Sequence, residues 1–121
     1  MNSYQEAKAL IDRRSGQGHP RAKLHKNVYL ESRSDGKIAV KYHGTDIIVY
    51  HPDGKIELDN GGWRTSSTKR NLNMYSPFHV YQEKGVWYVN KGPDFHDEGI
   101  VEFERGMILD TPEWVVATTA A

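Results

Sequence analysis

Residues 61–73 read Gly61-Gly62-Trp63-Arg64-Thr65-Ser66-Ser67-Thr68-Lys69-Arg70-Asn71-Leu72-Asn73. The two glycines end the alternating segment before them, because glycine adopts positive φ angles at little steric cost. The hydroxyl residues that follow are preferred helix N-caps, since a hydroxyl oxygen accepts a hydrogen bond from a free N–H of the first turn. The stretch therefore predicts a strand end, a glycine turn and a short capped helix from Thr68 to Tyr75.

The same stretch predicts a binding site for a phosphate or another anion. Backbone N–H groups at a helix N-terminus attract anions, and arginine and lysine side chains pair well with phosphate. Trp63 is expected to stack on a base. The predicted ligand-binding residues are Trp63, Arg64, Thr65, Ser66, Ser67, Thr68, Lys69 and Arg70.

The alternative interpretation of this stretch is an ordinary capped helix. In that case Gly61-Gly62 makes room for Trp63 to enter the core, and the cations are simply solvated. The stretch also lacks the Gly-Lys-Ser/Thr ending of a P-loop. No catalytic residue, metal ligand or cofactor is predicted.

Period-two alternation and turn residues predict short strands on both sides of this stretch. Asp35-Gly36 and Lys84-Gly85 are hairpin turns, and Ile47-Ile48-Val49-Tyr50, apolar on both faces, predicts the central strand. The expected strands are 25–33, 37–43, 46–51 and 55–59, which form a four-stranded meander, followed by 78–83, 86–90 and 100–104.

The N-terminal segment predicts a helix from Tyr4 to Arg14. Ser3 and Glu6 have the spacing of a capping box, and Lys8 with Asp12 is an i,i+4 ion pair. The fold class is therefore α+β: a mainly antiparallel sheet of about seven short strands, open or partly closed into a barrel, with an N-terminal helix and a short central helix.

The composition predicts one globular domain of 121 residues, with 37% hydrophobic and 26% charged residues. We expect an N-terminal helix and linker at 1–21, a β-rich core at 22–116 and a frayed tail at 117–121. The absence of cysteine excludes disulfides and thiolate metal sites. Because no apolar run is long enough to span a bilayer and the N-terminus lacks signal-peptide features, we expect no membrane partner and a cytoplasmic location.

The net charge of zero argues against broad nonspecific binding to nucleic acid. The charges are unevenly distributed, however. Residues 1–27 carry six cations and two acidic residues, whereas residues 91–121 carry two cations and seven acidic residues. A basic front and an acidic tail can meet within one molecule or between copies, so a homo-oligomer is one expected state.

Two other clusters contain side chains that bind metals. His43, Asp46 and His51 fit no zinc spacing, and Asp46 and His51 point to opposite faces of a regular strand. Asp94, His96 and Asp97, with Glu98 and with His79 nearby, could instead hold a divalent metal for nuclease chemistry. The simpler interpretation of each cluster is a set of solvated polar residues in turns and loops.

Three segments resemble a pattern in small proteins encoded by bacteriophages. That pattern combines a His-x-Thr-Asp-Ile strand, an Asp-Gly turn, and a Gly-Gly-Trp unit followed by threonines and a lysine. The resemblance covers roughly residues 22–110 and rests on Tyr42-His43-Gly44-Thr45-Asp46-Ile47-Ile48-Val49, Pro52-Asp53-Gly54-Lys55 and the unit that begins at Gly61. It implies a phage protein that acts inside a bacterial cell, and it supplies no mechanism.

These observations leave three functional hypotheses. The first is a non-enzymatic phage protein that binds a phosphate-bearing ligand, either nucleic acid or a nucleotide, and a host signalling nucleotide sequestered during defence is one such ligand. The second is a protein-interaction module that inhibits a host defence or replication protein. The third is a small metal-dependent nuclease that uses Asp94, His96 and Asp97.

Overall fold

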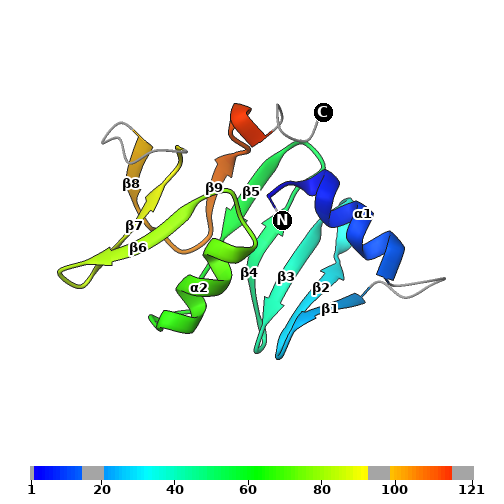
Figure 1. The fold of residues 1–121 in the computed structure, drawn as a ribbon, viewed down its shortest axis with the longest axis horizontal. Coiled ribbons are helices and arrows are strands. Elements are labelled where there is room, and N and C mark those ends of the chain that lie inside the picture. Colours follow the sequence, from blue (N-terminus) through cyan, green and yellow to red (C-terminus); the bar gives the residue numbers. More distant parts are fainter. Residues whose placement is uncertain (1, 15–20, 93–98, 116–121) are drawn as a thin grey trace.

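A computed structural model describes residues 2–14, 21–92 and 99–115. Its helices and antiparallel strands are those of an α+β chain (Figure 1). They are α1 (Tyr4–Arg14), β1 (Arg21–His25), β2 (Val28–Ser32), η1 (Ser34–Gly36), β3 (Ile38–Tyr42), β4 (Thr45–Tyr50), β5 (Lys55–Leu58), α2 (Ser66–Met74), β6 (His79–Glu83), β7 (Val86–Asn90), β8 (Ile100–Glu102) and β9 (Met107–Asp110).

The strands form two sheets, and every pairing in them is antiparallel. The larger sheet has six strands in the order β1-β2-β3-β4-β5-β9, and the smaller has three in the order β6-β7-β8. The predicted α+β class and both helices are confirmed. Both sheets stay open, so the partly closed barrel is not the form that this fold takes.

The segment predicted as one strand at 25–33 is wrong in its bounds. The chain turns between β1 and β2, and Asn27 there has a φ of 62°. Asparagine is one of the few side chains that enters this left-handed region readily, so a turn forms without a glycine to mark it. The meander thus has five strands, and a long-range pairing adds β9 at the edge beside β5.

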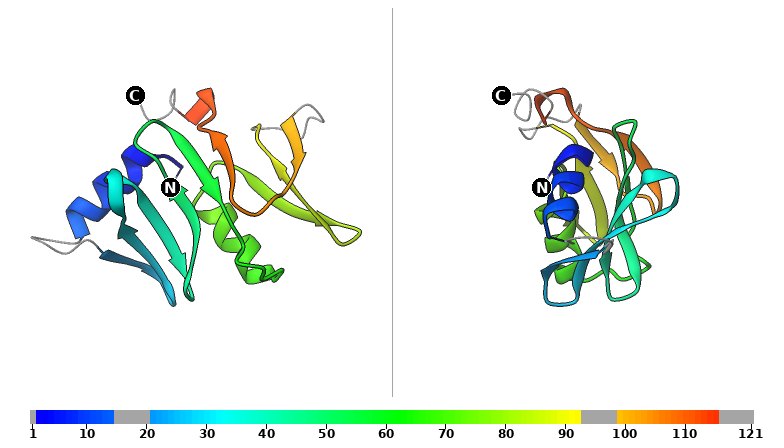
Figure 2. Two further views of the ribbon diagram at one scale, coloured as in Figure 1. Left: turned by 180° about the vertical axis from the view of Figure 1, so that it is seen from behind. Right: turned by 90° about the vertical axis from the view of Figure 1, so that its right-hand side faces the viewer.

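Both helices lie on the same face of the larger sheet (Figure 2). Ala7 and Ile11 of α1 are buried there, as are Leu72 and Tyr75 at the end of α2. The helix α1 has the predicted bounds and caps: Ser3 Oγ accepts from the Glu6 N–H at 3.3 Å. The core between helices and sheet consists mainly of Val28, Leu30, Ile38, Val40, Ile48, Tyr50, Ile56 and Leu58.

An irregularity in β4 prepares the site described below. Val40 pairs with Ile48, but the next residue, Lys41, pairs with Asp46, so Ile47 is an extra residue in β4. Such a bulge changes the direction of side chains locally. Ile47 and Ile48 are therefore both buried, although they are neighbours in one strand.

The Asn73 side chain makes two hydrogen bonds between α2 and the smaller sheet. Val80 lies in β6, the edge strand of that sheet, and its backbone N–H and C=O both bond to the Asn73 carboxamide, at 2.5 and 3.0 Å. On the other side of the helix, the buried Tyr50 hydroxyl donates to the Tyr75 carbonyl. In this way α2 connects the two sheets. The hairpin of β6 and β7 lies next to α2 and projects away from the larger sheet (Figure 1).

Candidate ligand-binding site

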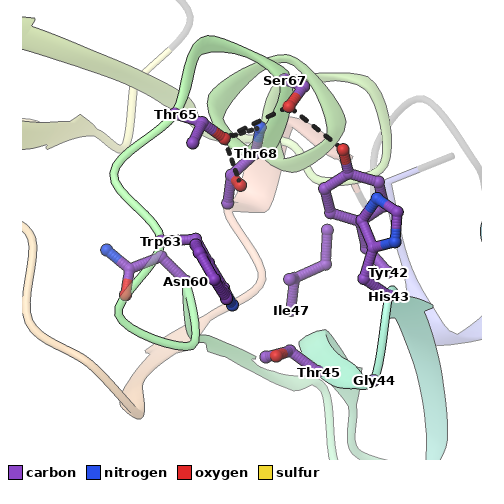
Figure 3. A pocket seen from close by; sticks show the side chains of 10 residues that line it. All are labelled: Tyr42, His43, Gly44, Thr45, Ile47, Asn60, Trp63, Thr65, Ser67 and Thr68. Carbon is purple, nitrogen blue, oxygen red and sulfur yellow. Dashed lines mark hydrogen bonds between the residues drawn. The ribbon is translucent and has the colours of Figure 1, made fainter.

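A cavity of about 630 Å³ opens between the β3–β4 turn and the segment that leads into α2 (Figure 3). We call it the Trp63 pocket. Its lining is aromatic, hydroxylic and amidic: Tyr42, His43, Gly44, Thr45, Ile47, Asn60, Trp63, Thr65, Ser67 and Thr68. A cavity of this size falls in the usual range for small-molecule sites.

The β3–β4 turn supplies one wall of the Trp63 pocket. His43 and Gly44 both have positive φ values, 55° and 133°, which make a tight two-residue connection between the strands. The rings of Tyr42 and His43 lie against each other, with centroids 4.3 Å apart. Ile47, turned inward by the bulge, lies between this wall and Trp63 (Figure 3).

The Asn60–Trp63 turn supplies the opposite wall. The buried Asn60 side chain accepts from the Gly62 N–H at 2.8 Å, and its carbonyl accepts from the Trp63 N–H at 2.9 Å. Gly61 has a φ of 64°, and a Cβ there would lie 2.5 Å from the Thr45 hydroxyl. Only glycine fits that position.

Trp63 is 65% exposed, so the interpretation in which the two glycines admit it to the core is wrong. The turn that Asn60 holds keeps the indole at the rim, facing the cavity across from Tyr42 and His43 (Figure 3). A large apolar side chain left in water gains little for folding. At this position Trp63 therefore contributes little to the stability of the fold.

Thr65 is the N-cap of α2, as the hydroxyl run predicted. Its Oγ1 accepts from the Thr68 N–H at 3.2 Å, and the helix starts at Ser66 rather than Thr68. A chain of hydroxyls extends from it across the pocket. Thr65 Oγ1 lies 2.8 Å from Thr68 Oγ1 and 3.2 Å from Ser67 Oγ, which accepts from the Tyr42 hydroxyl at 3.0 Å.

The polar groups of the pocket are mostly uncharged. Among the described residues that line it there is no carboxylate, lysine or arginine. Hydroxyls and an amide donate and accept hydrogen bonds. The pocket thus suits a planar ring with a mixed hydrogen-bonding edge rather than a bare anion.

One ion pair supports the wall that carries Trp63. Arg105 Nε bonds to Asp59 Oδ1 at 2.9 Å, and the same oxygen accepts from the Gly61 N–H at 3.0 Å. Burial alone would raise the pKa of the Asp59 carboxyl. The bonds from Arg105 and Gly61 outweigh burial and hold that pKa below its usual range.

The structure divides the predicted ligand-binding residues between the two sides of α2. Trp63, Thr65, Ser67 and Thr68 line the Trp63 pocket. Ser66, Lys69 and Arg70 line a second cavity, of about 400 Å³, and Arg64 donates to the Gly85 carbonyl at 3.3 Å. The cations therefore do not form one cradle with Trp63 and the pocket hydroxyls.

We call this second cavity the α2 groove. It lies between α2 and the edge of the smaller sheet and is lined by Ser66, Lys69, Arg70, Asn73, His79, Val80, Tyr81 and Gln82. The helical residues of this set follow the i, i+3, i+4, i+7 spacing of one helix face. Residues 65 and 68 lie on another face, which explains why neighbours in sequence line different cavities.

The structure describes the first of the two candidate metal clusters but not the second. Asp46 forms a bidentate pair with Arg33, at 2.7 and 2.9 Å, and His51 lies 3.3 Å from Glu57, so neither is directed at His43. In the part of the chain that the structure describes, no group of three metal-ligating residues forms. Asp94, His96, Asp97 and Glu98 lie outside the described residues.

Sequence reasoning missed six of the ten residues that line the pocket. Five of them lie at positions 42–47, in a hairpin well before the quoted stretch, and Asn60 comes directly before it. The sequence features that could have predicted these residues are the Tyr42–Thr45 turn and Asn60. Neither feature indicates by itself which surface of the protein its side chains face.

Comparisons with known proteins place the chain among phage proteins. A family model described as Kyanoviridae Gp96 protein matches residues 5–110. The chain belongs to the Kyanoviridae Gp96 protein family. Membership in this family confirms the phage protein that the resemblance implied, while the recurrence of the quoted motifs stays a prediction. Neither the curated proteins nor the solved structures contain a significant match.

The helices of the described part of this Gp96-family chain are short. None has the length and apolar character required to cross a membrane.

Proposed function

We propose that this phage protein is a non-enzymatic binding protein for a nucleotide-type ligand, which it holds in the Trp63 pocket inside the infected bacterial cell. The exposed indole of Trp63 carries the proposal. It faces Tyr42 and His43 across a cavity large enough for a base and its sugar. Aromatic stacking holds a base by its faces, and hydroxyl and amide groups can bond to its edge.

The phosphate would lie at the rim, toward the start of α2. Arg64 follows Trp63 directly and is exposed, and its contact with the Gly85 carbonyl at 3.3 Å is long enough to exchange for a phosphate oxygen. Binding in this mode needs no catalytic group. A phage protein of this kind would remove a nucleotide from the host pool, including one that signals infection.

Calorimetric titration tests the proposal with the common ribonucleoside monophosphates and a cyclic dinucleotide. We expect Trp63→Ala to weaken binding about 10- to 100-fold, the range for loss of one stacked ring. Met74→Ala is the matched control, because Met74 is 50% exposed at the far end of α2. No binding of any nucleotide by the wild-type protein would refute the proposal.

The ligand itself can be identified by native mass spectrometry of the protein purified from infected cells. A mass increment that corresponds to a nucleotide and is absent from Trp63→Ala would name the ligand class.

A second candidate function is inhibition of a host protein. Trp63, Met74 and Ile108 are large apolar side chains that each expose half or more of their surface. Tryptophan is a frequent binding hot spot between proteins. This function predicts that one host protein is captured from a nuclease-treated lysate by the wild type and that the capture is lost with Trp63→Ala.

A further inference from the structure

We propose that the ligand is a single strand of nucleic acid, which places one base in the Trp63 pocket and continues past the start of α2 into the α2 groove. This inference rests on the proposed function, because the strand begins with the base in the pocket. It is carried by two features of the groove that a mononucleotide in the pocket does not use: the cations Lys69 and Arg70, which pair with no carboxylate of the described residues, and a row of aromatic rings.

The cations on the groove side of α2 are solvent-accessible and lack carboxylate partners. The Lys69 ammonium bonds to the neutral Gln82 amide at 3.1 Å, and Arg64 bonds to a backbone carbonyl. Arg70 is exposed, and its side chain forms no hydrogen bond or ion pair with the described residues. Lys84, which directly precedes Gly85 in the β6–β7 turn, is another exposed cation.

Five arginines and lysines elsewhere in the described residues are paired with carboxylates. Arg33 bonds to both Glu31 and Asp46, and each of Lys8, Arg21, Lys55 and Arg105 pairs with a carboxylate. Within residues 2–14, 21–92 and 99–115, no such pair includes Arg64, Lys69, Arg70 or Lys84. A net charge of zero therefore coexists with a local basic surface, which is the footprint expected for a phosphate backbone.

The aromatic rings beside these cations lie in a row. The His79 and Tyr81 rings are stacked at 5.8 Å with an interplanar angle of 18°, and Tyr81 and Tyr88 are stacked at 5.6 Å with an angle of 27°. His79 and Tyr81 line the α2 groove together with Arg70. Successive bases stack on such rings without sequence preference, because every base presents a π face.

Both cavities reach the first turn of α2, on different faces of the helix. Ser66 lines the groove and Ser67 lines the pocket. A helix is about 10 Å across with its side chains, so a single nucleotide cannot occupy both cavities, whereas a short strand can. Glu83 comes two residues after Tyr81 on the same face of β6. Its carboxylate disfavours a phosphate there, so it limits how far the nucleic-acid strand extends along β6.

Fluorescence anisotropy with labelled oligothymidylate of about eight nucleotides, within the site-size range of small single-strand binders, tests the inference against thymidine monophosphate. We expect the oligonucleotide to bind at least 10-fold more tightly than the monophosphate. Lys69→Gln with Arg70→Gln should lower the slope of log affinity against log salt by about 1.4, which corresponds to two lost phosphate contacts on a single strand.

The matched control is Arg13→Gln with Lys26→Gln, an exposed arginine and lysine in α1 and the β1–β2 turn, which removes the same charge elsewhere. It should leave oligonucleotide affinity within 2-fold of wild type. Tyr81→Leu should weaken the oligonucleotide but not the monophosphate, and Tyr81→Phe, which keeps the ring, should not weaken either.

The outcomes separate this inference from the proposed function. Equal affinities for the oligonucleotide and the monophosphate, with no effect of the groove variants, would overturn the inference of a single-stranded ligand. The proposed nucleotide site in the Trp63 pocket would be unaffected by that result. Loss of oligonucleotide binding from the Arg13/Lys26 control as well as from the groove variant would also overturn it, because the effect would then follow total charge. Absence of binding to both probes would overturn both proposals.

Discussion

Replacing Asn73 with alanine should loosen the smaller sheet from the rest of the molecule. The Asn73 carboxamide bonds to both backbone groups of Val80 on the outer edge of β6, at 2.5 and 3.0 Å. In this respect it acts as a one-residue strand that pairs with the sheet edge. Val80 itself is 2% exposed, so water reaches its backbone groups poorly after the substitution.

The expected cost follows from these two bonds. Each contributes about 1 kcal/mol to stability, and alanine recovers roughly 0.6 kcal/mol through its higher helix propensity. The net loss in the free energy of unfolding is therefore about 1.5 kcal/mol. For a chain of this length, that corresponds to a fall in Tm of about 5–7 °C.

Circular dichroism melts of the wild type and three variants measure this effect. Asn73→Asp retains an acceptor but loses the donor to the Val80 carbonyl, so it should fall between the wild type and Asn73→Ala. Arg70→Ala, on an exposed position of the same helix, should change Tm by less than about 2 °C. If Asn73→Ala melts within that same margin of the wild type, the reasoning is refuted, because the smaller sheet then does not depend on this contact.

Other substitutions test the walls of the Trp63 pocket. Thr65→Ala should cost about 1 kcal/mol through loss of the N-cap, while Thr65→Ser should melt like the wild type. Gly61→Ala should lower the free energy of unfolding in urea by about 1–2 kcal/mol from its left-handed backbone alone. Adding Thr45→Ala should restore only the part of the stability loss that comes from the clash with the Thr45 hydroxyl. Arg105→Gln should destabilise at neutral pH. Because the folded pKa of Asp59 is lowered, the stability that this pair confers is present above about pH 4 and is lost as the pH falls below it, so urea melts of wild type and Arg105→Gln at pH 7 and pH 3 should converge at the lower pH. A difference that persists unchanged at pH 3 would contradict this assignment.

Local signals in the sequence predicted the helices well. The capping box of Ser3 and Glu6 marks the start of α1, and the helix has the predicted bounds Tyr4–Arg14. The hydroxyl run before α2 predicted the cap but left its position open among several candidates. Thr65 is the one that caps, so the helix begins at Ser66.

Strand boundaries were predicted less completely, for two different reasons. The turn at Asn27 uses a left-handed residue other than glycine, and its sequence signal is weak. The bulge at Ile47 makes an apolar run look like a strand buried on two faces, although both isoleucines are buried through a local irregularity. Pairing between β5 and β9 joins segments about fifty residues apart, and no local pattern encodes it.

The candidate site shows where sequence proximity misleads. Residues 63–70 look like one cluster, but the 3.6-residue period of α2 sends Thr65 and Thr68 to one side and Lys69 and Arg70 to the other. The β3–β4 turn, which completes the pocket, is brought there only by the tertiary fold. Exposure of Trp63, the observation on which the proposed function depends, likewise requires the folded structure.

The indole N–H signal of Trp63 in a two-dimensional NMR spectrum tests the central claim most directly. Trp63 is exposed at the pocket, whereas the indole nitrogens of Trp87 and Trp114 are buried and serve as internal references. Assigned through Trp63→Phe, the Trp63 signal should shift progressively as a nucleotide is added, while the other two stay in place. A Trp63 signal that does not move at saturating nucleotide, or that moves only together with the two buried signals, would contradict a base-binding pocket at this position.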